Sequence, residues 1–182
     1  MVYFTTRDLA AVALSASLWA VLNWLVAPIF WQLTHLPILC DMIGASLFIL
    51  THWWVRKPGA VSFMGIVATV LNFILRPGAF HFLGFAAASI VFDAATVIIG
   101  YRNSLERGLV SSVILVANSL VSTCVAGVII GSLFMDPMFL SQTFGGVAFF
   151  AVLHGGGGLI GGVLGVIIVK GLELRGVVPH SV

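Results

Sequence analysis

The chain has 182 residues, of which 60% are hydrophobic and 8% are charged, and its mean hydropathy is +1.18. This composition excludes an ordinary water-soluble domain, because too few polar side chains are present to cover its surface. The net charge of +2 comes from eight basic and six acidic residues scattered along the chain, which excludes a basic face for nucleic acid.

Six apolar segments follow one another along the chain, each long enough to cross a lipid bilayer. A spanning helix needs about 20 mainly apolar residues, and the breaks between such helices carry charge, proline or glycine. The segments are 9–30, 36–54, 59–75, 79–101, 109–134 and 144–172. The sequence therefore predicts an all-α integral membrane protein, one domain over 1–182 that folds as a compact bundle of six transmembrane helices. Because the connections are short, we expect consecutive helices to be antiparallel neighbours.

The basic residues predict how this bundle is oriented, since short cytoplasmic loops carry an excess of Lys and Arg. With six spans, Arg76 lies alone on one side of the membrane. The other basic residues all lie on the opposite side: Arg7, Arg56, Lys57, Arg102, Arg107, Lys170 and Arg175. We therefore expect a multi-pass protein of the cell membrane with both termini in the cytoplasm, and an outer face formed by 31–35, 76–78 and 135–143.

Polar side chains near the outer ends of these helices are candidates for a small-molecule site. A polar group inside a bilayer is costly unless it pairs, packs or binds a ligand, and ligand sites combine aromatic walls with a few polar groups. Two further candidates, nearer mid-membrane on the last two helices, suit the floor of such a site. The predicted substrate-binding residues are Trp31, Asp41, Asn72, Arg76, His81, Asn118, Gln142 and His154.

Most of these candidates also have a purely structural interpretation. Asp41 is close to a helix N-terminus, where a carboxylate favours the helix dipole. Asn72 fits a hydrogen bond to a neighbouring helix, and Arg76 fits contact with lipid headgroups. His81 fits the headgroup region, and Asn118 and His154 fit interhelical hydrogen bonds.

Asp93 stands apart from these candidates because it lies in the inner half of the fourth predicted helix. An isolated carboxylate at that depth needs a partner or a proton. A partner subunit, a nearby Ser or Thr, and proton coupling remain alternatives for it.

Small residues form stripes on the first and last predicted helices. Ala16 and Ala20 form a small-xxx-small pair, with Ala13 on the face of Ala20, and such pairs let another helix approach closely. Both an internal neighbour and a partner protein fit this stripe, and the predicted partner-docking residues are Ala13, Ala16 and Ala20. The stripes of the last helix predict packing within the chain and consist of Gly157, Gly161 and Gly165, and of Gly158 and Gly162.

The sequence contains no motif for catalysis or nucleotide binding. Without G-x-x-x-x-G-K-[ST], the chain is not itself a P-loop ATPase. H-E-x-x-H and G-x-S-x-G are also absent, and no two carboxylates are spaced for hydrolysis, so we expect no catalytic residues and no enzyme. Cys40 and Cys124 lack C-x-x-C spacing and are predicted to be small core residues, with no metal site and no cofactor.

Three segments resemble a known family. The first, R-D-L-A-A-V-A-L-S-A-S-L-W-A-V-L at 7–22, resembles the first helix of S components, the substrate-binding subunits of energy-coupling factor (ECF) type ABC importers. That family carries an A-x-x-x-A pattern there, which Ala16 and Ala20 match. The second, R-K-P-G-A at 56–60, is similar to the YkoE group, S components assigned to thiamine or its hydroxymethylpyrimidine precursor. The third, 161–177, looks like the last helix of an S component.

The resemblance implies a subunit that captures a thiamine-related molecule from outside and delivers it with an ECF transmembrane subunit and two ATPase subunits. The alanine stripe would dock onto the transmembrane subunit. YkoE-like proteins carry glutamates on the third helix, where this chain has Gly65 and Asn72, so a neutral pyrimidine fits at least as well as a cationic thiazolium. Another vitamin or a metal ion is an alternative cargo, and a non-transporting membrane scaffold is an alternative function.

Overall fold

The computed structural model describes residues 3–179, which contain helices and connections but no strand. The helices are α1 (Thr6–Leu25), α2 (Ala27–Thr34), α3 (Ile38–Val55), α4 (Ala60–Leu75), the 3-10 turn η1 (Phe80–Phe82), α5 (Leu83–Ile99), α6 (Tyr101–Leu105), α7 (Leu109–Leu133), α8 (Pro137–Phe144) and α9 (Val147–Leu174). Five of them are long and apolar enough to cross a membrane: α1, α3, α5 together with η1, α7 and α9. The sixth predicted span is the shorter α4, which has 16 residues.

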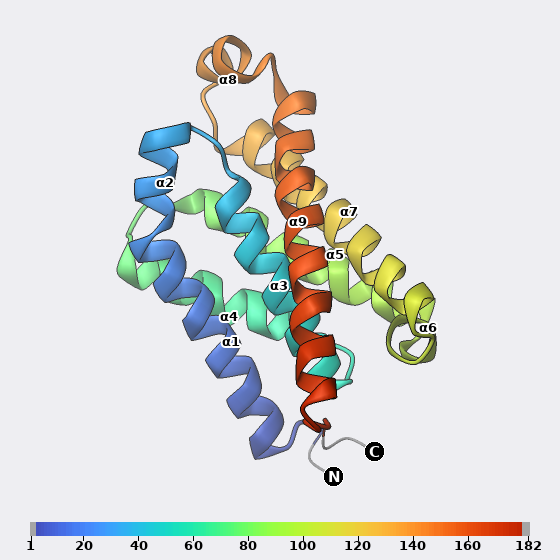
Figure 1. The fold of residues 1–182 in the computed structure, drawn as a ribbon. Coiled ribbons are helices and arrows are strands. Elements are labelled where there is room, and N and C mark those ends of the chain that lie inside the picture. Colours follow the sequence, from blue (N-terminus) through green and yellow to red (C-terminus); the bar gives the residue numbers. More distant parts are fainter. Residues whose placement is uncertain (1–2, 180–182) are drawn as a thin grey trace.

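The six longer helices pack as a closed ring in the order α1, α4, α5, α7, α9, α3 and back to α1. Figure 1 shows α9 running along the length of the molecule beside α3 and α7. The expectation that consecutive helices are neighbours is confirmed for α4 with α5, α5 with α7 and α7 with α9. It is only partly right for α3 and α4, because α3 packs chiefly against α9 and α4 chiefly against α1 and α5.

The first predicted span, 9–30, is two helices rather than one, which corrects the sequence-based boundary. α1 ends at Leu25, and α2 begins at Ala27 with Pro28 in its first turn. Proline has no backbone N–H, and its ring clashes with the carbonyl group four residues earlier, so a straight helix does not continue through it.

The predicted outer connection at 135–143 also contains a short helix, α8, which the side chain of Asp136 caps by accepting from the Phe139 N–H at 2.8 Å.

The beginning of α1 and the end of α9 lie at the same end of the molecule (Figure 1). Lys57 Nζ lies 2.6 Å from Asp8 Oδ2 there, which ties the α3–α4 connection to the first turn of α1. Nearby, Trp53 Nε1 donates to Glu173 Oε1 at 3.0 Å and joins α3 to α9. The opposite end carries α2 and α8, and the connection between α4 and α5, which holds Arg76, lies on the side of the bundle.

Glycine stripes on two sides of α9 let it approach α3 and α7 closely. A methyl group added at Gly161 would overlap the backbone of Met42 on α3, and one at Gly158 would overlap the side chain of Thr123 on α7. Ser46 Oγ donates to the Gly161 carbonyl at 2.9 Å across the α3–α9 contact. These contacts confirm the predicted packing within the chain. The residues facing α3 are Gly157, Gly161 and Gly165, and those facing α7 are Gly155, Gly158 and Gly162.

The alanine stripe of α1 also packs inside the bundle. Ala16 and Ala20 are 0% and 1% exposed, where α1 meets α4 and α3. Their small side chains let these helices approach, and the helices of the bundle itself cover them. Of the three residues predicted to dock a partner, only Ala13 is exposed.

Asp93 has a partner on α4, and it is a serine, one of the alternatives that the sequence left open, although the contact is with its backbone. Its Oδ2 atom accepts from the backbone N–H of Ser62 at 3.0 Å. Ser62 is the third residue of α4, and the first N–H groups of a helix have no partner within it. Asp93 therefore caps α4 from α5, and its charge is favourable beside the positive end of the α4 dipole.

Candidate functional site

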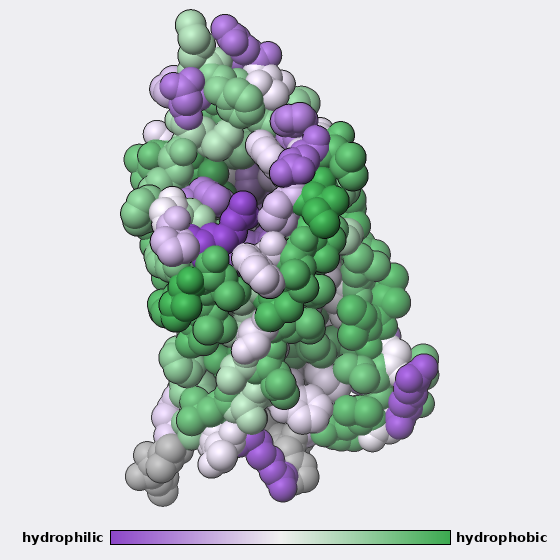
Figure 2. All heavy atoms as spheres, turned by 90° about the vertical axis from the view of Figure 1, so that its left-hand side faces the viewer, coloured by the Kyte–Doolittle hydropathy of each residue, from purple (hydrophilic) through white to green (hydrophobic). Residues whose placement is uncertain are grey.

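A cavity of about 390 Å³ lies at the end of the molecule that carries α2 and α8. Figure 2 shows hydrophilic side chains gathered in a hollow of this half, on a surface that is otherwise mostly hydrophobic. The walls come from α1, α2, α3, α5, α7 and α9, and from the connection between α4 and α5. Its size is within the range of small-molecule sites.

One wall of the cavity is a stacked aromatic pair. The rings of Trp19 and Phe85 lie 3.6 Å apart between centroids and 10° from parallel, and Phe82 meets Trp19 edge-on at 5.7 Å. Trp19 Nε1 donates to the Cys40 carbonyl at 3.3 Å, which fixes the indole. A Cβ atom at Gly44 would lie 2.6 Å from the Phe85 ring, so the glycine makes room for the pair. The result is a flat apolar surface suited to a planar ring.

A buried carboxylate and imidazole meet at another wall. Asp41, in the first turn of α3, places Oδ2 2.7 Å from Nδ1 of His154 on α9, and their side chains are 9% and 6% exposed. Gly157 and Gly127 permit this approach, because a Cβ atom at Gly157 would lie 2.8 Å from Asp41 Cβ and one at Gly127 would lie 2.9 Å from His154 Cβ. Among the described residues, His154 Nε2 has no hydrogen-bond partner, although it is buried, and the 2.7 Å contact of Nδ1 with Asp41 Oδ2 does not have hydrogen-bond geometry. Buried polar atoms are normally paired, so these unpaired atoms beside the cavity are candidates for ligand contact.

Asn23 is a lining residue that the sequence analysis missed. It is 1% exposed and donates through Nδ2 to Asn72 Oδ1 at 3.3 Å, while Asn72 Nδ2 donates to the Ala68 carbonyl at 3.0 Å. The Oδ1 atom of Asn23 has no partner within residues 3–179. Asn23 follows Trp19 by four residues, and this helical spacing puts both on one face of α1; that spacing and the polarity of Asn23 are the signals that were available.

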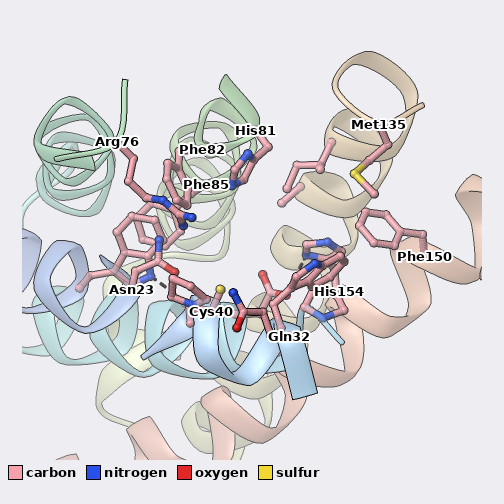
Figure 3. A pocket seen from close by; sticks show the side chains of 18 residues that line it. Asn23, Gln32, Cys40, Arg76, His81, Phe82, Phe85, Met135, Phe150 and His154 are labelled. Carbon is pink, nitrogen blue, oxygen red and sulfur yellow. Dashed lines mark hydrogen bonds and ion pairs between the residues drawn. The ribbon is translucent and has the colours of Figure 1, made fainter. Parts of the chain in front are cut away.

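The side of the cavity formed by the α4–α5 connection carries the guanidinium group of Arg76 and the imidazole of His81. Figure 3 shows Arg76 and Asn23 on one side, with His81 above them, and His154 on the other side. Trp31 and Gln32 line the cavity from α2, and the Trp31 ring lies 6.2 Å from that of Phe144 on α8. The short helices α2 and α8 therefore meet beside the cavity.

The structure brings most, but not all, of the predicted binding residues together. Asn72 is 0% exposed and supports Asn23 from behind rather than lining the cavity. Asn118 on α7 donates to the Phe92 carbonyl of α5 at 2.9 Å, so it makes the interhelical hydrogen bond that its structural interpretation described. Gln142 is exposed on α8 and does not line the cavity. The predicted residues that do line it are Trp31, Asp41, Arg76, His81 and His154.

The cavity combines a carboxylate–imidazole pair, an amide and a guanidinium group around a flat aromatic wall. This combination can hold a small, planar, polar molecule in one orientation. In the part of the chain that the structure describes, no three His, Cys, Asp or Glu side chains come together as a metal site requires. Comparisons with protein-family models, with curated proteins and with solved structures find no match for this chain.

Proposed function

We propose that this chain is the substrate-capturing subunit of an ECF-type importer and that it binds a thiamine-related small molecule in the cavity. The observation that carries the proposal is the stacked Trp19–Phe85 wall beside the buried Asp41–His154 pair. The resemblance of 7–22, 56–60 and 161–177 to S components supports the class of importer. An ECF transmembrane subunit and two ATPase subunits supply the energy.

The chemistry of the wall groups suits an aminopyrimidine. Its ring packs against the aromatic pair, and its exocyclic amino group donates to the Asp41 carboxylate, which accepts hydrogen bonds. His154 Nε2 and Asn23 Oδ1 are the further polar atoms available to it. A ligand that hydrogen-bonds to these atoms removes the free-energy cost of leaving them unpaired. The same groups therefore raise the affinity for a polar ring and select against an apolar ring.

In this proposal the bundle crosses the cell membrane six times, with both termini in the cytoplasm. The 16 residues of α4 span about 24 Å, somewhat less than the hydrocarbon core, and such a mismatch is met by local thinning of the bilayer. The end with seven of the eight basic residues faces the cytoplasm, and the cavity opens to the outside.

Cysteine labelling tests this orientation. In a chain with Cys40→Ala and Cys124→Ala, we expect Gln142→Cys to react with a membrane-impermeant maleimide in intact cells. Arg107→Cys is expected to react only after permeabilisation, because both positions are exposed but lie at opposite ends of the bundle. The reverse pattern would contradict the orientation and would turn the cavity toward the cytoplasm.

Ligand binding tests the proposed function directly. We expect purified protein to bind thiamine or 4-amino-5-hydroxymethyl-2-methylpyrimidine at submicromolar concentration in calorimetric titrations, with quenching of tryptophan fluorescence. Trp31→Phe is expected to reduce the quenching because Trp31 lines the cavity. Trp24→Phe is the control, since Trp24 is 44% exposed and does not line it.

The alternatives are separated by the same titrations. Heat with nickel or cobalt salts, and none with the vitamins, would favour a metal-importing S component. Absence of heat with every vitamin, precursor and metal would favour a membrane scaffold, whose exposed apolar helix faces serve assembly alone.

A further inference from the structure

The cavity has a carboxyl group on one side and a guanidinium group on another. The carboxylate of Asp41 comes from α3 and lies 2.7 Å from the His154 ring of α9. Arg76 and His81 come from the connection between α4 and α5, and Figure 3 shows both directed toward the same space, with Arg76 across from His154. A ligand that fills this space meets the Asp41 carboxyl group at one end and the Arg76 guanidinium cation at the other.

Arg76 is held at the edge of the cavity by the way α4 ends. Its backbone N–H donates to the Asn72 carbonyl at 2.7 Å and closes the last turn. Pro77 follows, and a residue before proline is driven out of the helical region, so Arg76 leaves the helix at φ −139° and ψ 82°. The sequence Arg-Pro therefore turns this side chain away from the helix path.

The guanidinium group of Arg76 has no partner in the described part of the chain. It takes part in no salt bridge, and no side-chain hydrogen bond involves it. Three other basic residues do have partners: Lys57 pairs with Asp8, Lys170 with Glu173, and Arg56 Nε donates to the Trp53 carbonyl at 3.3 Å. The remaining basic residues are exposed and, like Arg76, have no side-chain partner in the described part of the chain: Arg7, Arg102, Arg107 and Arg175. What sets Arg76 apart is that it is the one Lys or Arg side chain that lines the cavity.

We infer that the ligand of this cavity is two-ended, with an anionic group, a phosphate monoester or a carboxylate, bound by Arg76 beside His81. Its hydrogen-bond-donating ring end lies at Asp41 and His154. A guanidinium group binds such oxyanions through two parallel hydrogen bonds, and the Asp41 carboxylate repels them, so the two ends fix the direction of the ligand. This inference rests on the proposed small-molecule function and deepens it.

A matched pair of probes tests the inference: 4-amino-5-hydroxymethyl-2-methylpyrimidine and its phosphate monoester, titrated in phosphate-free buffer and dodecyl maltoside. We expect the ester to bind at least about tenfold more tightly than the alcohol to the unaltered protein, which corresponds to about 1.4 kcal/mol. Arg76→Gln is expected to remove this preference, and Arg76→Lys to retain part of it, since a lysine keeps the charge but not the two-point geometry. Arg107→Gln, at the opposite end, is the control and leaves the preference intact.

Three outcomes would overturn the inference. If the alcohol binds as well as the ester, the proposed function stands and the anionic end is wrong. If Arg76→Gln leaves the preference intact but lowers thermal stability in phospholipid nanodiscs alone, Arg76 serves lipid phosphates rather than the ligand. If neither probe binds, and thiamine and its monophosphate do not bind either, the inference fails together with the proposed function.

Discussion

Asp41→Asn is expected to weaken binding of the pyrimidine probe at least about 100-fold. The carboxylate is 9% exposed, lies 2.7 Å from the His154 ring and borders the cavity. The asparagine amide keeps the shape of the side chain but loses the charge. Its NH2 group is only a donor, so it cannot accept a hydrogen bond from the amino group of the ligand if it faces that group. Leaving a buried donor without its acceptor costs about 1–3 kcal/mol, and a 100-fold loss of affinity corresponds to about 2.7 kcal/mol. Calorimetric titration measures it.

Asp93→Asn is the matched control for this variant. Asp93 is also buried, at 3% exposure, but it caps α4 and does not line the cavity. Asparagine keeps an oxygen that accepts from the Ser62 N–H, so the helix cap persists. We expect wild-type affinity for this variant; an equal loss of binding in both variants would show that Asp41 acts through general stability rather than through the ligand.

Gly161→Ala is expected to give the largest loss of stability among single methyl additions on α9. The new methyl group would overlap the Met42 backbone, and backbone atoms do not move aside as the end of a side chain does. Overpacking of a tight core costs about 1–3 kcal/mol, and we expect the upper part of this range. Thermal unfolding in detergent, followed by tryptophan fluorescence and by size-exclusion elution, measures the loss.

Gly156→Ala and Gly171→Ala on the same helix are the controls. A Cβ atom at either position meets nothing within 4 Å, and alanine is the better helix former by about 1 kcal/mol. We expect these variants to be as stable as the unaltered protein or slightly more stable. If Gly161→Ala unfolds at the same temperature as these two control variants, α9 does not approach α3 as closely as described above.

Much of the helical framework was predictable because apolar length alone decides it. Segments such as 109–134 and 36–54 agree with α7 and α3 to within about two residues at each end. The break in the first segment was missed because hydropathy does not register Pro28, which interrupts the helix without interrupting the apolar run. A proline inside a predicted span was the signal for it.

The position of a site residue along its helix was readable from the sequence, but the direction in which each side chain faces was not. Asp41 was expected at the start of the second predicted helix and His154 on the last one. Their contact depends on how closely α9 approaches α3, which Gly157 permits, and α7, which Gly127 permits. Asn23 and Asn72 are hydrogen-bonded neighbours, and only the rotation of α1 and α4 puts Asn23 on the cavity side. The same rotation turns Ala16 and Ala20 inward.

The interlocked contact between α9 and α3 has a mechanical consequence. The two backbones approach each other closely at Gly157, Gly161 and Gly165, and the hydrogen bond from Trp53 to Glu173 joins the helices at the end away from the cavity. Two helices joined in this way do not slide along each other, because sliding would drive one backbone into the other. A displacement of α3 or α9 beside the cavity would therefore tilt the two helices together and would shift the exposed Glu173 at the opposite end of the pair.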